Sequence, residues 1–248
     1  MALALAFWAF ATKRPRPLDG LIGSDVDAHR CFSTQDGISI PAPAPAAAVE
    51  DRLEAAQRIW DSAAPIAGTP GEAYLASRGI DLTDVPDQGG LRFHARCPWG
   101  NGIAPCVVAR YSDALTAEPR GIWRRPTSGE KPKSLGPTGG CVIRLYNTIE
   151  GALVLGEGVE TVLSAATRLM FRGAYLRPAW AAGNAANMAS FPVLPGIERL
   201  IVLVDHDENR AGELASEQCE VRWLAAGRET QRLMPEGVGE DFNDLVRP

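Results

Sequence analysis

The chain has 248 residues, of which 46% are hydrophobic and 22% are charged, and its formal net charge is -5. This composition is ordinary for a soluble globular protein, and the length allows one large domain or two small ones with a real core. The acidic balance argues against a simple nucleic-acid coat or a basic membrane-surface binder. The five cysteines form no CxxC pair, so we expect reduced thiols in a cytoplasmic protein rather than a disulfide framework or a zinc ribbon.

Residues 1–48 are expected to be a poorly ordered tail that ends in a linker. The opening MALALAFWAF is apolar, but it is about half the length of a membrane-spanning helix and lacks the positive start of a signal peptide. We therefore expect no membrane segment. The run PAPAPAAA at residues 41–48 favours extended conformations and indicates a domain boundary.

Residues 49–149 are predicted to form a small α+β domain. Its first helix should begin at Val49, where apolar residues follow at helical spacing, and a second helix should cover EAYLASRG and end at Gly79. Residues 91–146 contain short β-rich runs that are broken by Gly and Pro, which favours an antiparallel sheet.

This predicted sheet is locally basic. Between Arg92 and Arg144, nine Lys or Arg residues stand against three acids. Cations beside a phosphate-binding site are suited to hold a nucleic-acid backbone or a triphosphate. A solvated hairpin is the alternative, because surface loops are commonly charged. The candidate nucleic-acid-binding or nucleotide-binding residues are Arg124, Arg125, Lys131 and Lys133.

Two further features of this region have a structural interpretation. His94, Cys97 and Cys106 lack the fourth ligand and the usual spacing of a zinc site, so we interpret them as strand and loop residues. Trp99 and Trp123 are able to stack on bases, but tryptophans in a small β-sheet are more often core or interface residues.

Residues 150–248 are predicted to form an α/β domain. Four apolar runs, ALVLG, AWAAG, RLIVLV and ETQRLMP, are interpreted as buried strands. Apolar strands that alternate with helices are typical of a parallel sheet covered on both faces. The helices are expected over EGVETVLSAATRLMF, over NAANMASF, from about Asn209 to Ala226, and as a last turn over DFNDLV.

Carboxylates follow three of these predicted strands. Glu157 follows the first, Asp205 and Asp207 follow the third, and Asp241 and Asp244 follow the fourth. Ligands in such sheets lie beyond the carboxyl ends of the strands. Residues 205 and 207 point the same way along an extended segment, and two such carboxylates repel each other unless a cation lies between them. Oxygen-only ligands favour Mg²⁺ or Mn²⁺, which predicts phosphoryl or nucleotidyl transfer.

Each acid also has a structural interpretation. Asp207 could cap the helix that follows it, and Glu157 could complement a helix dipole. Asp241 could cap DFNDLV, with Asp244 as its capping-box partner. Capping does not explain why all of them lie at successive strand ends. No lysine follows Lys133, which argues against haloacid-dehalogenase-type phosphatases and phospho-receiver domains.

The C-terminal half resembles the Toprim domain of DnaG-type primases, topoisomerases, OLD-family nucleases and recombination proteins. The matching motifs are LGEGVETVLS, VDHDENRAG and the terminal DFNDL. Together they are most similar to the Toprim region of phage-type and plasmid-type primases. Upstream, GTPGEAYLASRGI, LRFHARCPW and KSLGPTGGCVIRL are similar to the region that precedes Toprim in those proteins.

This resemblance implies roles for the acidic residues. Glu157 would be the acid/base residue, Asp205 and Asp207 would be metal ligands, and Asp241 would be a further acidic contributor. Glu160 and Asp244 are second-tier candidates. The implied function is Mg²⁺-dependent or Mn²⁺-dependent nucleotidyl transfer on single-stranded DNA, with nucleotides as substrates, in plasmid or mobile-element replication. A helicase or another replication protein is a candidate partner.

Two alternatives share the same site. One is a Toprim nuclease or other strand-cleaving enzyme, although the four tyrosines offer no setting for a topoisomerase nucleophile. The other is a non-catalytic Toprim protein that binds nucleic acid. A domain kept only as a scaffold has no physical reason to hold repelling carboxylates together, which argues against the second alternative.

Overall fold

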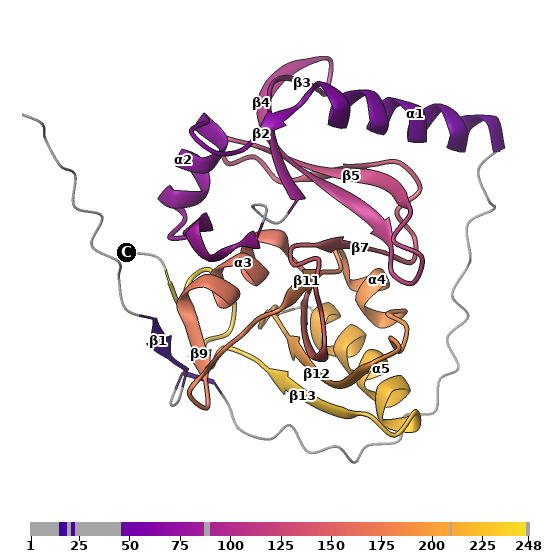
Figure 1. Ribbon diagram of the computed structural model, residues 1–248. Coiled ribbons are helices and arrows are strands. Elements are labelled where there is room, and N and C mark those ends of the chain that lie inside the picture. The colour runs from indigo at the N-terminus through magenta and orange to yellow at the C-terminus, as the bar shows by residue number, and fades with distance from the viewer. Residues whose placement is uncertain (1–14, 19–20, 23–45, 87–89, 209, 247–248) are drawn as a thin grey trace, which may run out of the picture.

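The computed structural model describes residues 15–18, 21–22, 46–86, 90–208 and 210–246. The chain folds into two stacked lobes, an N-terminal lobe in purple and magenta and a C-terminal lobe in orange and yellow (Figure 1). The apolar opening MALALAFWAF, the PAPAP part of the predicted linker and Asn209 lie outside the described residues. Within those residues, no helix has the length and apolarity needed to cross a bilayer.

Two helices begin the N-terminal lobe, as predicted. Helix α1 (Ala46–Ser62) starts three residues before Val49, because the alanines at 46–48 have high helix propensity. Helix α2 (Pro70–Ser77) is capped by Thr69, whose hydroxyl accepts a hydrogen bond from Gly71 N at 3.2 Å. A short 3₁₀ helix, η1 (Leu82–Asp84), leads into the sheet.

The rest of this lobe is an antiparallel sheet, which agrees with the sequence pattern. All pairings among its strands are antiparallel, in the order β2-β3-β4-β7, with β5 paired to β4 and β6 paired to β5. The strands are β2 (Ala64–Pro65), β3 (Leu91–Trp99), β4 (Gly102–Asp113), β5 (Pro119–Pro126), β6 (Lys133–Leu135) and β7 (Cys141–Arg144).

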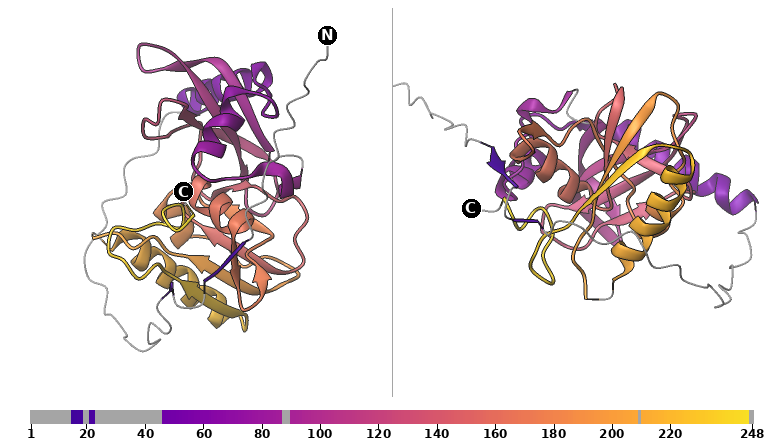
Figure 2. Two further views of the ribbon diagram at one scale, coloured as in Figure 1. Left: turned by 90° about the vertical axis from the view of Figure 1, so that its left-hand side faces the viewer. Right: turned by 90° about the horizontal axis from the view of Figure 1, so that it is seen from below.

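The C-terminal lobe is a parallel α/β fold. Its four main strands pair in the order β13-β12-β8-β11, and every pairing among them is parallel. They are β8 (Gly151–Gly156), β11 (Ala179–Ala181), β12 (Ile197–Leu203) and β13 (Glu229–Leu233), and the helices between them are α3 (Val159–Arg168), α4 (Ala185–Ala189) and α5 (Ala211–Ala225). The right-hand view of Figure 2 shows α3 and α5 on opposite sides of these strands.

Two predicted helical segments are less extensive than expected. The helix expected over residues 157–171 ends at Arg168, and β9 (Leu169–Phe171) then forms a hairpin with β10 (Ala174–Tyr175). Both residues of the connecting turn, Arg172 and Gly173, have positive φ angles of 50° and 78°. Such a two-residue turn suits the twist of a hairpin and cannot continue a helix. The segment DFNDLV forms successive turns rather than a helix.

The described part of the N-terminal segment is attached to the C-terminal lobe. Strand β1 (Arg16–Pro17) pairs in parallel with β9, and Leu18 is fully buried. Ile22 forms a β-bridge with Pro235. These residues therefore differ from the poorly ordered tail that the sequence suggested.

The two lobes share one sheet and one core. Strand β7 pairs antiparallel with β11, so that a single ten-stranded sheet runs through both lobes. Alternate residues of β8 serve opposite faces, with Val154 in the cluster that α3 covers and Leu155 in the cluster that contains α5 residues. The first cluster also contains Leu75 and Tyr111 of the N-terminal lobe. The predicted α+β and α/β regions are thus joined by a common hydrophobic core.

Candidate active site

The predicted carboxylates gather at one edge of the parallel sheet. Strand β8 ends at Gly156 and strand β12 ends at Leu203, and these two residues lie opposite each other in the register. Glu157 and Asp205 therefore leave neighbouring strands at the same edge. The charges of Asp241, Glu157 and Asp207 all act on the Asp205 carboxylate, so the structure brings the four acids into one electrostatic cluster. We call Glu157, Asp205, Asp207 and Asp241 the acidic site.

Asp205 is the most perturbed member of the acidic site. Burial, followed by repulsion from Asp241, Glu157 and Asp207, raises its pKa to about 8. The Thr161 side chain has a smaller effect on the Asp205 pKa, in the opposite direction. The Oδ1 atom of Asp205 is buried and has no hydrogen-bond partner among the described residues. Burial and the charge of Asp207 also raise the pKa of Glu157.

This donor set fits a divalent cation by its chemistry. A cation would relieve the mutual repulsion of the carboxylates and would supply a partner for Asp205 Oδ1. Carboxylate oxygens are the ligands that Mg²⁺ and Mn²⁺ prefer. In the part of the chain that the structure describes, no three His, Cys, Asp or Glu side chains converge on a common point that would hold an ion. The fit therefore rests on donor type and burial, and not on a formed coordination sphere.

Two glycines allow the backbone to present Glu157. A Cβ on Gly156 would lie 2.6 Å from Val162 Cγ2, so glycine allows α3 to pack closely on the end of β8. Gly183, with a φ of 80°, donates its N–H to the Glu157 carbonyl at 2.8 Å. A Cβ at Gly183 would overlap the Tyr111 ring and hydroxyl.

The structure adds Tyr111, Thr161 and Gly183 to the surroundings of the acidic site, none of which was a predicted site residue. Tyr111 of β4 is fully buried, and its pKa is raised mainly by burial, with a smaller effect from the Glu157 charge. Thr161 was inside the EGVETVLS motif, but nothing in the sequence showed that its side chain reaches Asp205. Gly183 was the last residue of the predicted strand AWAAG, and no sequence pattern indicated its contact with Glu157 or Tyr111.

Two predicted site residues have other partners. Glu160 Oε2 pairs with Arg78 Nε at 3.1 Å, and Glu160 Oε1 pairs with Arg125 Nε at 3.0 Å. The Tyr74 hydroxyl donates to Glu160 Oε1 at 2.9 Å and accepts from Arg125 Nε at 2.8 Å. We call these four residues the interlobe cluster. Both Glu160 oxygens are thus engaged by arginine side chains, and the interlobe cluster keeps a net positive charge because two guanidinium groups share one carboxylate.

Asp241 and Asp244 hold each other in place. Asp244 N donates to Asp241 Oδ1 at 2.8 Å, and Asp241 N donates to Asp244 Oδ2 at 3.1 Å. This is the reciprocal arrangement of a capping box, here formed at a turn instead of a helix. Asn243 is fully buried between them and donates to Arg78 O and to Ser164 Oγ, both at 2.8 Å. Asp244 therefore positions the segment, while Asp241 contributes its charge to the acidic site.

Backbone hydrogen bonds hold the segment between the two central aspartates. His206 N donates to Glu240 O at 3.0 Å, and Gly239 N donates to His206 O at 2.6 Å. The His206 ring also contacts Pro235 O through Nδ1 at 3.0 Å. The loop that carries Asp241 is consequently anchored against the end of β12.

Three of the predicted nucleic-acid-binding residues lie together on the N-terminal lobe. Lys131 and Lys133 are exposed, and Lys133 Nζ lies 4.7 Å from the centre of the Trp99 ring. The Arg124 guanidinium lies 5.6 Å from the same ring centre. Trp123 is a core residue. We call Arg124, Lys131, Lys133 and Trp99 the basic surface.

His94, Cys97 and Cys106 are strand residues of β3 and β4, as interpreted from the sequence. Both cysteines are fully buried in the core cluster under α1.

Comparison with known proteins agrees with the motifs. Residues 152–248 match the family model described as Toprim domain, and residues 50–144 match a domain of unknown function, DUF7146. A search of curated proteins found no match. The chain therefore contains a Toprim domain, as its resemblance to that family predicted.

Two solved structures are similar to this chain. One is the primase fragment of the bacteriophage T7 primase-helicase protein, with 20% identity and a TM-score of 0.46. The similarity covers 68% of this chain and 66% of the T7 fragment, so this chain spans just under two thirds of the fragment's length. The other shows the bacteriophage T7 lagging-strand DNA polymerase interacting with primase domains of two gp4 subunits bound to an RNA/DNA hybrid and dTTP. Its identity is 19% and its TM-score 0.42, with 68% of this chain and 83% of that chain covered.

Proposed function

We propose, because residues 152–248 are a Toprim domain, that this protein is a primase-like nucleotidyl transferase. It would act with Mg²⁺ or Mn²⁺ on single-stranded DNA during plasmid or mobile-element replication. The observation that carries the proposal is the gathering of Glu157, Asp205, Asp207 and Asp241 at one sheet edge, with Asp205 Oδ1 buried and unpaired among the described residues.

The residues of the acidic site would have two roles, metal binding and proton transfer. Asp205, Asp207 and Asp241 would hold the ion, which when bound would supply positive charge against the phosphate oxygens of a nucleotide. Glu157 would accept the proton of the attacking hydroxyl, a role that suits a carboxyl whose pKa is raised by burial. The Thr161 side chain would favour the charged form of Asp205.

The basic surface would hold the template strand. Lys131 and Lys133 are exposed, and no acid is paired with either of them among the ion pairs of the described residues. Trp99 presents an aromatic ring beside Lys133, so that one surface combines charge and stacking as single-strand binding requires. Arg125 is not included in this surface, because its Nε contacts Glu160 and the Tyr74 hydroxyl in the interlobe cluster.

A cytoplasmic location and a helicase or other replication partner are part of the same proposal. The described cysteines, which are Cys97, Cys106, Cys141 and Cys219, are all buried free thiols. Such thiols are expected in a reducing compartment.

The proposal is tested by the incorporation of labelled NTPs and dNTPs on single-stranded DNA with Mg²⁺ or Mn²⁺. We expect product from the wild type and none from Glu157→Gln. Glu198→Gln is the matched control, since Glu198 lies at the opposite end of β12, and it should retain the activity. Following the template in the same reactions tests the alternatives. Cutting without synthesis would assign the protein to the nucleases, and metal binding without either activity would favour a binding role.

A metal titration separates the roles of the two kinds of aspartate. Asp205→Asn should lose Mg²⁺ binding in calorimetry, whereas Asp244→Ala should retain it and lose about 1 kcal/mol of unfolding free energy, the usual cost of a lost cap. Equal losses of Mg²⁺ binding in the two variants would contradict the assignment of Asp244 as a positioning residue.

A further inference from the structure

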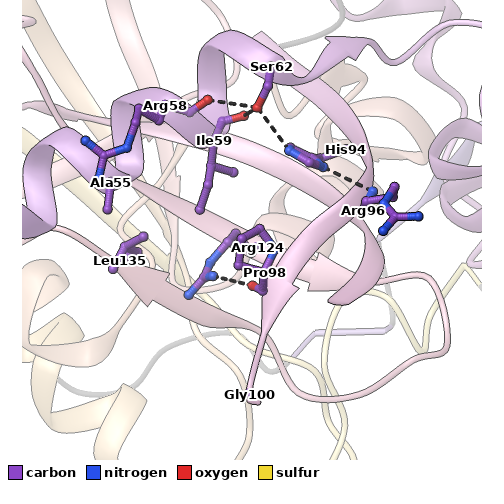
Figure 3. Close-up of a pocket in the computed structure, with 10 residues that line it drawn as sticks. All are labelled: Ala55, Arg58, Ile59, Ser62, His94, Arg96, Pro98, Gly100, Arg124 and Leu135. Carbon is purple, nitrogen blue, oxygen red and sulfur yellow. Dashed lines mark hydrogen bonds between the residues drawn. The ribbon is translucent and has the colours of Figure 1, made fainter. Parts of the chain in front are cut away.

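A cavity of about 590 Å³ lies in the N-terminal lobe, between α1 and the antiparallel sheet (Figure 3). Its walls come from α1, from β3 and the turn after it, and from β5 and β6. Its size is in the range of ligand pockets. None of its lining residues belongs to the acidic site, so a ligand here would not require the metal-dependent centre.

The charged residues of this pocket are all basic. Arg58, Arg96 and Arg124 line it, and no Asp or Glu does. Figure 3 shows Arg58 on α1 at the rim of the pocket and Arg124 over the strands of the sheet. The Arg58 side chain is 69% exposed and pairs only weakly with Glu54, one helical turn away, at 3.3 Å. The pocket is therefore suited to an anion.

Arg124 is anchored beside this pocket. Its Nη1 donates to Pro98 O at 2.7 Å. A guanidinium binds phosphate oxygens through charge-assisted hydrogen bonds, so Arg124 is suited to contact an oxyanion in the pocket.

The remaining wall is apolar and flat. Ile59 is buried and Leu135 is partly buried, and they form the apolar side of the pocket.

The Ser62 hydroxyl donates to Arg58 O at 2.8 Å and therefore accepts from His94 Nε2 at 3.0 Å, while His94 Nδ1 accepts from Arg96 N at 3.2 Å. This network fixes the ring in its neutral tautomer, and burial lowers the His94 pKa further. The ring is a rigid polar edge and not a fourth cation.

We propose that this pocket binds a nucleoside phosphate, with the phosphate between Arg58 and Arg124 and the nucleoside against Ile59 and Leu135. The combination of guanidinium groups with an apolar wall and a fixed ring distinguishes it from a site for a bare anion. The nucleoside phosphate would come from a free nucleotide or from the phosphorylated end of a strand. This binding goes beyond the proposed transferase activity. It shares Arg124 with the basic surface and involves no residue of the acidic site.

Equilibrium dialysis of the full chain with labelled ATP in EDTA tests this inference, because chelation removes any metal-dependent binding at the acidic site. We expect saturable binding that Arg58→Ala weakens about tenfold and that Arg58→Ala with Arg124→Ala removes, as loss of charge-assisted hydrogen bonds predicts. Arg52→Ala is the matched control, since Arg52 is an exposed arginine of the same helix outside the pocket. Asp205→Asn should bind ATP as the wild type does.

Competition separates the two sources of the ligand. Displacement of ATP by a 5′-phosphorylated oligonucleotide at lower concentration than by its 5′-hydroxyl form would identify a strand end, and equal weak competition by both would identify a free nucleotide. Absence of ATP binding in EDTA would overturn the inference. So would displacement of ATP by inorganic phosphate at equal concentration, or equal weakening by Arg52→Ala and Arg58→Ala. Because Arg58 is exposed on a helix, its substitution tests the pocket even if the Arg124 variant misfolds.

Discussion

Arg125 of β5 and Glu160 of α3 form a half-buried ion pair of 3.0 Å that joins the two lobes beside the acidic site. Tyr74 of α2 bonds to both residues, and Arg78 holds the second oxygen of Glu160 at 3.1 Å. Glu160 lies in the first turn of α3, three residues after Glu157. The N-terminal lobe thus fixes the helix that follows the candidate acid/base residue.

Removing Glu160 should destabilise the whole chain. In Glu160→Ala, Arg125 and Arg78 lose their carboxylate while they remain partly buried, so we expect a loss of about 3 kcal/mol in unfolding free energy. Glu54→Ala breaks an exposed pair on α1 and should cost less than about 0.5 kcal/mol. Chemical denaturation of both variants measures the difference. Equal, small effects would show that the interlobe cluster does not stabilise the fold.

The stability of the metal-free protein should fall as the pH rises. The pKa of Asp205 is about 8 in the folded state, against an ordinary value of 3.8, so the folded state binds a proton that the unfolded state releases. This contribution is complete below pH 4 and is lost as the pH rises towards 8, with a slope of at most about 1.4 kcal/mol per pH unit.

Denaturation in EDTA at pH 5, 6.5 and 8 measures this slope, and Asp205→Asn should flatten it. Mg²⁺ at pH 8 should restore stability to the wild type, because an ion that binds only the folded state stabilises it by mass action. An unchanged slope in Asp205→Asn would mean that Asp205 does not carry the raised pKa.

The close approach of Gly183 and Tyr111 should not tolerate a side chain. Gly183→Ala would combine a positive φ of 80° with an overlap against the buried Tyr111 ring, and we expect it to cost about 3 kcal/mol or more. Gly173→Ala has nearly the same φ of 78° but open space around its Cβ, so it should cost only about 1–2 kcal/mol. Thermal melts compare the two. Similar losses would show that backbone strain alone, and not the contact with Tyr111, restricts residue 183.

The two exposed lysines of the basic surface should set the salt dependence of DNA binding. In the double variant Lys131→Ala/Lys133→Ala, log K for DNA binding should fall less steeply with log salt concentration. The magnitude of the slope should decrease by about 1 for each phosphate contact that is lost, at every sequence tested. Arg52→Ala with Arg199→Ala removes the same charge from other surfaces and should leave the slope unchanged. Fluorescence anisotropy with labelled single-stranded DNA over a salt series gives both slopes. No change in the lysine variant would remove the basic surface from the DNA-binding site.

Local patterns were sufficient for the main strands of the C-terminal lobe. The continuous apolar runs that became β8 and β12 are local features of the sequence. The hairpin of β9 and β10 was missed because the apolar residues up to Phe171 continue the apolar pattern of helix α3. The turn at Arg172 and Gly173 makes the segment pair as a hairpin instead.

The amino-acid sequence by itself determined the parallel α/β class and the placement of Glu157, Asp205, Asp207 and Asp241 after the strands, because strand ends are local features. Only the tertiary structure decided which charges remain free. Glu160 and Arg125 have the same residue types as members of a metal or nucleic-acid site, but contacts between segments far apart in the chain pair them with each other. A carboxylate or guanidinium acquires its role from the charges and burial around it, and those arise only when the two lobes pack together.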